Sequence, residues 1–229
     1  DDNWIFCLVM HHIVSDGWSM DIFIRELLSL YQSNCAGELN ALAPLRIQYK
    51  DYASWQQEQL VTGVFETHKK YWLEQFSGEL PVLSGLGDLI RPDTRATTGS
   101  VFVKALCEDD ISRLKTYVQQ EGGSIFMGFL SLLSILLYKY TSQSDMIIGC
   151  PIAGRDQADL SGQIGFYLNM LALRTRVDTE TDFRSVFQGV RKVTLEAYEH
   201  QSFPFDELIE ALAPVRESGR APLFDVLID

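Results

Sequence analysis

Apolar residues are distributed along the chain in two ways, which predict strands and helices. Four short, mainly apolar segments predict buried strands, over residues 4–10, 145–150, 167–177 and 223–228, and residues 100–106 alternate like a further strand. Helical spacing or longer apolar stretches predict helices over residues 18–35, 49–60, 65–76, 124–140, 182–200 and 205–212, with another beginning near residue 109 and closing at 122–123. Strands and helices in alternation predict an α/β fold, built as an α+β sandwich.

A segment of different composition separates two parts of this pattern. Residues 77–99 are rich in Gly, Pro, Asp and Thr, which predicts a long loop between two lobes. We therefore expect residues 1–76 to belong to one lobe and residues 100–229 to the other. Because the first and last residues run directly into predicted buried strands, we also expect an interior piece of a longer polypeptide, truncated at both ends.

Composition and charge narrow the class of protein. The chain has 229 residues, 46% of them hydrophobic, and a net charge of -12, so it is ordinary for a globular protein and unsuited to nucleic acid. Residues 124–140 are short for a bilayer span and predict a buried core helix, so no membrane contact is expected. The four cysteines lack metal-site spacing, which indicates reduced thiols in the cytoplasm and no metal site.

The candidate chemistry lies at the histidine pair between the first predicted strand and helix. His11 and His12 are followed by Asp16 and Gly17. Neighbouring strand residues point to opposite faces, so one imidazole would face the interior and the other a cavity, where it could move a proton near pH 7. Asp16 could cap the helix or pair with an arginine, and Gly17 could permit close backbone approach. Catalysis and a structural histidine pair both remain open on this spacing alone.

Five motifs together resemble the condensation domains of nonribosomal peptide synthetases. The first is Met-His-His-Ile-Val-Ser-Asp-Gly-Trp-Ser at residues 10–19. The others, in family order, are residues 49–55, residues 164–169 with Arg174, residues 200–206 and residues 216–224. The resemblance covers nearly the whole chain, and the family is about twice as long.

The resemblance implies a chloramphenicol-acetyltransferase-like fold of two lobes with a tunnel between them. It implies amide bond formation between aminoacyl or peptidyl thioesters on the phosphopantetheine arms of donor and acceptor carrier domains, with no cofactor bound by the chain itself. An adenylation domain is expected in the same polypeptide. His12 is the predicted base or positioning group, His11 supports it, and Gly17 lets the loop approach the reacting carbonyl.

The remaining site residues are expected to have architectural or tunnel roles. Asp16 is predicted to brace the loop by a salt bridge, with Arg155 as its candidate partner, and Trp18, Arg155 and Asn169 are expected at the substrate tunnel. His200 is interpreted as structural and His68 as a surface helix residue. Three alternatives stay open: an acyltransferase that uses coenzyme A or a carrier, an epimerisation domain, and a non-catalytic carrier-docking module.

Overall fold

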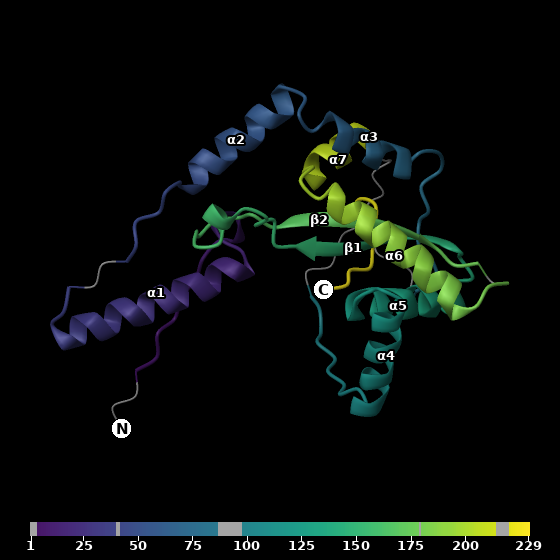
Figure 1. Cartoon of the computed structure of the whole chain (residues 1–229), viewed down its shortest axis with the longest axis horizontal. Coiled ribbons are helices and arrows are strands. Elements are labelled where there is room, and N and C mark those ends of the chain that lie inside the picture. Colours follow the sequence, from purple (N-terminus) through teal and green to yellow (C-terminus); the bar gives the residue numbers. More distant parts are fainter. Residues whose placement is uncertain (1–3, 40–41, 87–97, 179, 214–219) are drawn as a thin grey trace. The chain divides into compact units, whose positions relative to one another are not determined.

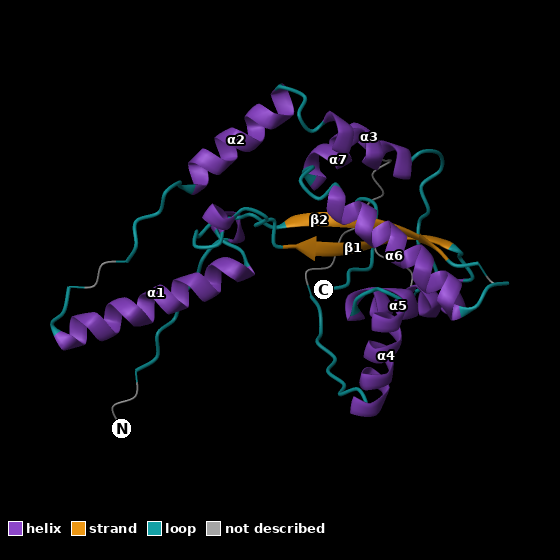
Figure 2. Cartoon of the chain, in the orientation of Figure 1, coloured by secondary structure: helices purple, strands orange, loops and turns teal. Residues whose placement is uncertain are grey.

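The computed structural model contains the predicted helices and a two-stranded sheet. It describes residues 4–39, 42–86, 98–178, 180–213 and 220–229. In chain order the elements are η1 (His12–Val14), α1 (Gly17–Ala36), α2 (Tyr49–Val61), α3 (Glu66–Gln75), α4 (Glu108–Gln120), α5 (Ile125–Thr141), β1 (Asp145–Ile152), η2 (Ala158–Leu160), β2 (Asn169–Arg176), α6 (Phe183–Glu199) and α7 (Phe205–Leu212) (Figures 1 and 2). The α/β class predicted from the sequence is confirmed.

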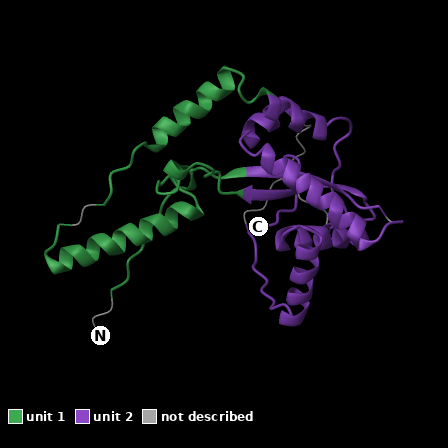
Figure 3. Ribbon diagram, in the orientation of Figure 1, with its two compact units in different colours: residues 1–66, 152–169 green, residues 67–151, 170–229 purple. Residues whose placement is uncertain are grey.

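The chain forms two compact units. The first contains residues 1–66 and 152–169, and the second contains residues 67–151 and 170–229 (Figure 3). Residues 152–169 belong to the first unit because their side chains and backbone bind the turn that contains Asp16. This grouping differs from the predicted lobes at 1–76 and 100–229, which refer to a complete domain and stay a prediction. Residues 87–97 of the predicted inter-lobe loop lie outside the described residues.

In the first unit, α1 and α2 are held by polar caps and by aromatic packing. Asp16 is the N-cap of α1, and Gly37 ends the helix in the left-handed conformation. Two aromatic rings of α2 pack against Tyr167. The Tyr52 and Tyr167 ring centres are 4.8 Å apart, and those of Tyr49 and Tyr167 are 5.1 Å apart. These contacts bring two motifs that are far apart in sequence, residues 49–55 and 164–169, side by side.

In the second unit, helix α5 supplies much of the core. It contacts both α4 and α6, and its buried positions include Met127, Leu130 and Leu137. The sheet is also enclosed, since consecutive residues of both strands are buried (146–150 of β1 and 171–173 of β2). Among the described residues no single helix is long and apolar enough to cross a membrane; α4 and α5 satisfy the length and composition criteria only as a pair bent by 107°.

Two polar groups join α3 and the segment after it to the sheet and α6. Arg174 of β2 binds Asp145 of β1 with Nη2–Oδ2 at 2.8 Å, and also donates to the carbonyls of residues 75, 77 and 79. His200 follows α6, stacks on Tyr71 with 4.1 Å between ring centres, and approaches His68 with 2.9 Å between the Nδ1 atoms. The expectation that His68 is a simple surface residue is therefore wrong: it is half-buried against His200.

Two predicted strands are absent from the described residues and a third is reduced to one bridge. Residues 4–11 and 100–106 have no regular structure, and their side chains are largely exposed, as at Ile5 (96%) and Val101 (90%). Residues 223–228 contribute an isolated parallel bridge between Leu227 and Gly149. An apolar run becomes a strand only when a neighbouring strand accepts its backbone hydrogen bonds, and the described part of the chain provides none for the first two segments.

Candidate active site

The carboxylate of Asp16 lies at the centre of a buried hydrogen-bond network in the first unit. Its Oδ1 accepts from the backbone N of Ser19 at 2.8 Å and from Ser19 Oγ at 2.6 Å, and its Oδ2 accepts from the backbone N of Tyr167 at 3.0 Å. The first bond caps helix α1, the second holds the Ser19 hydroxyl, and the third binds the motif at residues 164–169. Asp16 therefore joins the histidine turn to a segment about 150 residues later in the chain.

Arg155 is the charged partner of Asp16. Its Nη2 lies 3.1 Å from Asp16 Oδ1, and the two side chains are 1% and 3% exposed. The same guanidinium donates to the carbonyls of Leu160 and Gln163, and its carbon lies 4.1 Å from the centre of the Tyr167 ring. A buried ion pair needs such further hydrogen bonds to offset its desolvation, and here they reach both terminal nitrogens of Arg155, whereas its buried Nε has no hydrogen-bond partner among the described residues.

The network also sets the charge of Asp16. Burial raises the pKa of this carboxyl group, but hydrogen bonds from Ser19 and Tyr167, together with the positive charge of Arg155, outweigh burial and leave the pKa below its usual value. Asp16 is therefore ionised at neutral pH and cannot act as a general acid there. Its chemistry is that of a fixed anion that holds a turn.

The histidine pair lies on a turn and not at the end of a strand. His12 begins the 3-10 helix η1, and His11 caps it by accepting a hydrogen bond from the backbone N of Ile13 at its Nδ1, 3.1 Å away. Both side chains are exposed, so the expectation that one faces the interior is wrong. Strand alternation does not apply to a 3-10 turn. The His12 ring meets Phe166 edge-to-face, with 5.5 Å between centres and 82° between planes.

The other predicted site residues have less distinctive surroundings. Gly17 begins α1, and its backbone lies outside the left-handed region. A Cβ at this position would meet no atom within 4 Å beyond its chain neighbours and the adjoining helix backbone. Neither the backbone conformation nor crowding by the described chain therefore requires glycine here. Close approach of Gly17 to a substrate stays a prediction. Trp18 is 49% exposed and donates to the carbonyl of Ser161 at 3.0 Å. Asn169 begins β2 and is half-buried, and its tunnel role stays a prediction.

Several residues of the network were not predicted. Ser19 is fully buried, and its hydroxyl bonds both the N and the O of Gly165, at 3.0 and 2.8 Å. Tyr49 donates its hydroxyl to the carbonyl of Phe166 at 3.0 Å, and Tyr167 donates to Gln163. The spacing Asp-x-x-Ser at residues 16–19 is an N-cap signal that could have identified Ser19. The contacts of Tyr49 and Tyr167 could be identified only from the tertiary structure.

Gly165 provides a test of how tightly this network is packed. A Cβ at Gly165 would overlap the Tyr49 ring and lie 2.8 Å from Cε2 of Tyr167, both of them bonded in place. We expect Gly165→Ala to lower the free energy of unfolding by about 1–3 kcal/mol in urea titration, because overpacking displaces these rings. Gly162→Ala, whose Cβ would make an ordinary 4.0 Å contact with Leu45, is the matched control, and equal stability of the two variants would contradict the packing argument.

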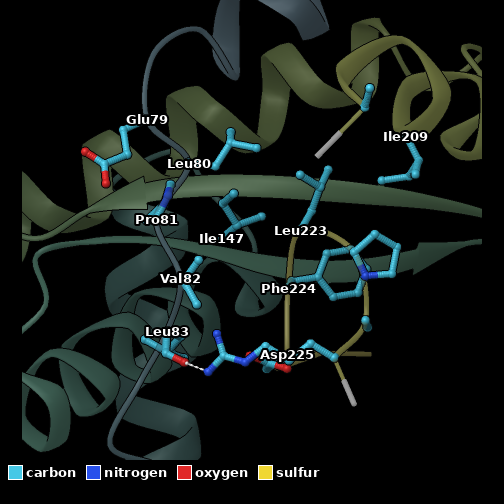
Figure 4. A pocket seen from close by; sticks show the side chains of 14 residues that line it. Glu79, Leu80, Pro81, Val82, Leu83, Ile147, Ile209, Leu223, Phe224 and Asp225 are labelled. Atoms are coloured by element: carbon cyan, nitrogen blue, oxygen red, sulfur yellow. Dashed lines mark hydrogen bonds and ion pairs between the residues drawn. The ribbon is translucent and has the colours of Figure 1, made fainter. Parts of the chain in front are cut away.

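A separate cavity occupies the second unit. It has a volume of about 670 Å³ and a mainly apolar lining that includes Val82, Ile147 and Phe224, with Arg220 and Asp225 among its charged residues (Figure 4). Arg220 donates to the carbonyl of Leu83 at 2.9 Å. None of the predicted site residues lines this cavity.

In the part of the chain that the structure describes, no cluster of three or more His, Cys, Asp or Glu side chains is placed to hold a metal ion.

The fold and the histidine turn define a condensation-type domain, and comparison with known sequences supports this class. The model of the family described as "Condensation domain" matches residues 1–229, so the chain belongs to that family. Tyrocidine synthase 3 of Brevibacillus parabrevis is 39% identical over 226 residues, which are 99% of this chain and 3% of that protein. Bacitracin synthase 2 of Bacillus licheniformis is 41% identical over 220 residues, or 96% of this chain and 8% of that protein.

Known structures confirm the chloramphenicol-acetyltransferase-like fold. The X-domain from teicoplanin biosynthesis superposes with a TM-score of 0.87 at 27% identity, over 95% of this chain and 49% of the X-domain chain. The condensation domain from the Monacolin K polyketide synthase MokA gives a TM-score of 0.78 at 24% identity, over 95% of this chain and 51% of that one. The chain therefore spans about half the length of these structures and a small part of the two synthases.

Proposed function

We propose that the protein containing this chain forms an amide bond between two thioesters, each held on the phosphopantetheine arm of a carrier domain. The observation that carries the proposal is an exposed His12 imidazole on a turn anchored by the buried Asp16–Arg155 pair. The acceptor α-amine attacks the carbonyl carbon of the donor thioester. A C–N bond forms, the C–S bond breaks, and the proton lost by the amine balances the thiolate released on the donor arm.

His12 acts on the attacking amine in this reaction. A neutral imidazole accepts the proton of the amine as it attacks, or hydrogen-bonds the amine and stabilises the charged tetrahedral species. Both roles need a ring nitrogen open to the substrate and a backbone that does not move. The exposed side chain and the anchored turn supply these two requirements.

The other residues support the turn or face the substrate arms. His11 closes the 3-10 turn through its Nδ1, and Asp16 with Arg155 holds the turn to residues 160–167. Gly17 leaves the start of α1 open to the reacting carbonyl, since beyond its chain neighbours and the adjoining backbone of α1 no described atom lies within 4 Å of the Cβ position. Trp18 and Asn169 are proposed to line the path of a phosphopantetheine arm. Arg155, the third residue expected there, has a side chain only 1% exposed and paired with Asp16, so it supports the turn and does not line this path.

The proposed partners are donor and acceptor carrier domains and an adenylation domain in the same polypeptide. The relatives are synthases far longer than this chain, and one similar structure, with a TM-score of 0.83, is a four-domain nonribosomal peptide synthetase bound to AMP and glycine. We place the protein in the cytoplasm because all four of its cysteines are free, three of them exposed, and such thiols persist in a reducing compartment.

One other function has an observation in its favour. The X-domain from teicoplanin biosynthesis, which superposes on this chain with a TM-score of 0.87, also has a structure in complex with OxyB. A docking module that recruits a protein partner is therefore the second candidate. A docking module does not need an accessible imidazole, whereas the His12 side chain is exposed beside Phe166, which favours the catalytic function.

Carrier domains loaded with defined aminoacyl groups test the proposal. The complete protein, given a donor and an acceptor carrier loaded by its neighbouring adenylation domains, should yield the dipeptidyl product on the acceptor carrier, measured by mass spectrometry. The same donor as a coenzyme A thioester should give little product. Turnover of the coenzyme A thioester alone would indicate an acyltransferase, inversion of a single aminoacyl carrier would indicate an epimerisation domain, and the absence of any reaction would indicate a docking module.

A further inference from the structure

Phe166 is the aromatic neighbour of the proposed catalytic imidazole. Its ring centre lies 5.5 Å from that of His12, with the two planes at 82°. The last side-chain torsion of histidine is broad and roughly two-fold, so an imidazole without neighbours samples several orientations. An edge-to-face neighbour restricts that rotation, because only some orientations keep the ring contact.

The position of Phe166 is set by the residues on either side of it. Side chains alternate between buried and exposed from residue 163 to residue 167, so Phe166 points away from the buried network that Gln163 and Tyr167 enter. The backbone of Gly165 is bonded at both N and O to Ser19 Oγ, and the backbone N of Tyr167 donates to Asp16. The carbonyl of Phe166 itself accepts from Tyr49. Three consecutive residues are thus anchored to the rest of the unit.

The Ser19 hydroxyl is the junction of this anchor. It accepts hydrogen bonds from Gly165 N at 3.0 Å and from Arg155 Nη2 at 2.9 Å, which use both of its lone pairs. Its single proton is placed between Asp16 Oδ1 at 2.6 Å and the carbonyl of Gly165 at 2.8 Å. The hydroxyl is therefore fully committed to protein partners, and the same group connects the histidine turn to the segment that presents Phe166.

We propose that Phe166 is a positioning residue that orients the His12 imidazole for attack by the acceptor amine. The inference rests on the proposed function, since it concerns the geometry of the same reaction. Phe166 does not exchange a proton with the substrate. It acts through His12 by keeping one ring orientation populated, and Ser19 and Asp16 act on Phe166 by fixing its backbone.

Variants of Phe166 in the complete protein test the inference. Phe166→Leu keeps an apolar side chain but removes the flat ring, so we expect kcat for dipeptide formation to fall about 10- to 100-fold, since small errors in placing a catalytic group have effects of that size. KM for the loaded carriers should stay constant. Phe166→Tyr retains the ring and should restore kcat. Leu27→Ala is the control, because it removes an apolar side chain of nearly the same exposure (37% for Leu27, 36% for Phe166) at another place on the surface. This variant should leave kcat unchanged.

A spectroscopic measurement separates positioning from a structural role. The imidazole resonances of His12, in protein labelled with ¹³C-histidine, should carry a ring-current shift from Phe166 that Phe166→Leu removes and Phe166→Tyr preserves. The inference would be overturned if Phe166→Leu kept the wild-type kcat and its His12 resonances stayed at their wild-type positions. It would also be overturned by a loss of kcat that follows a lowered melting temperature and is not restored by tyrosine. Either result leaves the proposed function standing, because that function is tested separately, by formation of the dipeptidyl product on loaded carriers by the wild-type protein.

Discussion

Replacing His12 with alanine is expected to reduce dipeptide formation by about 10²–10⁴-fold, the range typical of a lost general base, and so to abolish product within the time of the assay. The melting temperature should hardly change, because the His12 side chain is exposed and its described neighbour is the Phe166 ring at the surface. Single-turnover measurements with loaded carriers would record the rate, and thermal unfolding would record the stability. Loss of rate without loss of stability identifies a chemical role.

His11→Ala is the matched control for this result. His11 accepts one exposed hydrogen bond, from the backbone N of Ile13, whose net worth is about 1 kcal/mol. Its removal should loosen the 3-10 turn and lower the rate to a smaller extent than His12→Ala. A folded His12→Ala protein with undiminished amide formation would refute the assignment of His12, and a larger loss at His11 than at His12 would exchange the roles of the two histidines.

Removing the Asp16 carboxylate should have the largest effect on stability. In Asp16→Ala the guanidinium of Arg155, 1% exposed, keeps its charge without a counter-ion, which destabilises a fold by about 3–5 kcal/mol. The rate should fall as well, because the turn that presents His12 loses its bonds to Ser19 and Tyr167. Urea titration would measure the change, and an unaltered melting temperature would rule out the bracing role.

A double-mutant cycle separates the ion pair from general damage. Asp16→Ala combined with Arg155→Met should destabilise the protein by less than the sum of the single changes, because removal of both charges leaves neither one buried alone. Arg46→Ala serves as the control, since the Arg46–Asp159 pair belongs to the same unit but Arg46 is 82% exposed. Such a surface pair contributes at most about 1 kcal/mol. Additive effects at Asp16 and Arg155 would contradict direct coupling.

The lowered pKa of Asp16 adds a pH dependence to this prediction. A carboxyl group whose pKa is lower in the folded than in the unfolded chain stabilises the fold fully above its unfolded value, about 3.9, and the stabilisation is lost as the pH falls through the folded value. The wild-type protein should therefore lose stability in acid more steeply than Asp16→Asn. Equal slopes below about pH 4 would contradict the depressed pKa.

The helices and the family were readable from the sequence, whereas some strands were not. Helical spacing, a long apolar stretch and capping residues located α1 to α7, because the hydrogen bonds of a helix are local and its start, end and buried face are set by residues close together in the chain. Residues 4–11 and 100–106 are as apolar as β1, yet they form no strand in the described chain. A strand depends on a partner elsewhere in the chain, and apolar composition alone does not report whether that partner is present.

The candidate site divides in the same way. By itself the sequence determined the order of the motifs, the helix that begins after Asp16, and the family, because caps and motifs are read from residues close together in the chain. Only the tertiary structure decided that Arg155 rests against Asp16, that Ser19 binds Gly165, and that Phe166 meets His12. These contacts join residues more than 130 positions apart, and their geometry follows from how the backbone near residue 165 packs against α1 and α2.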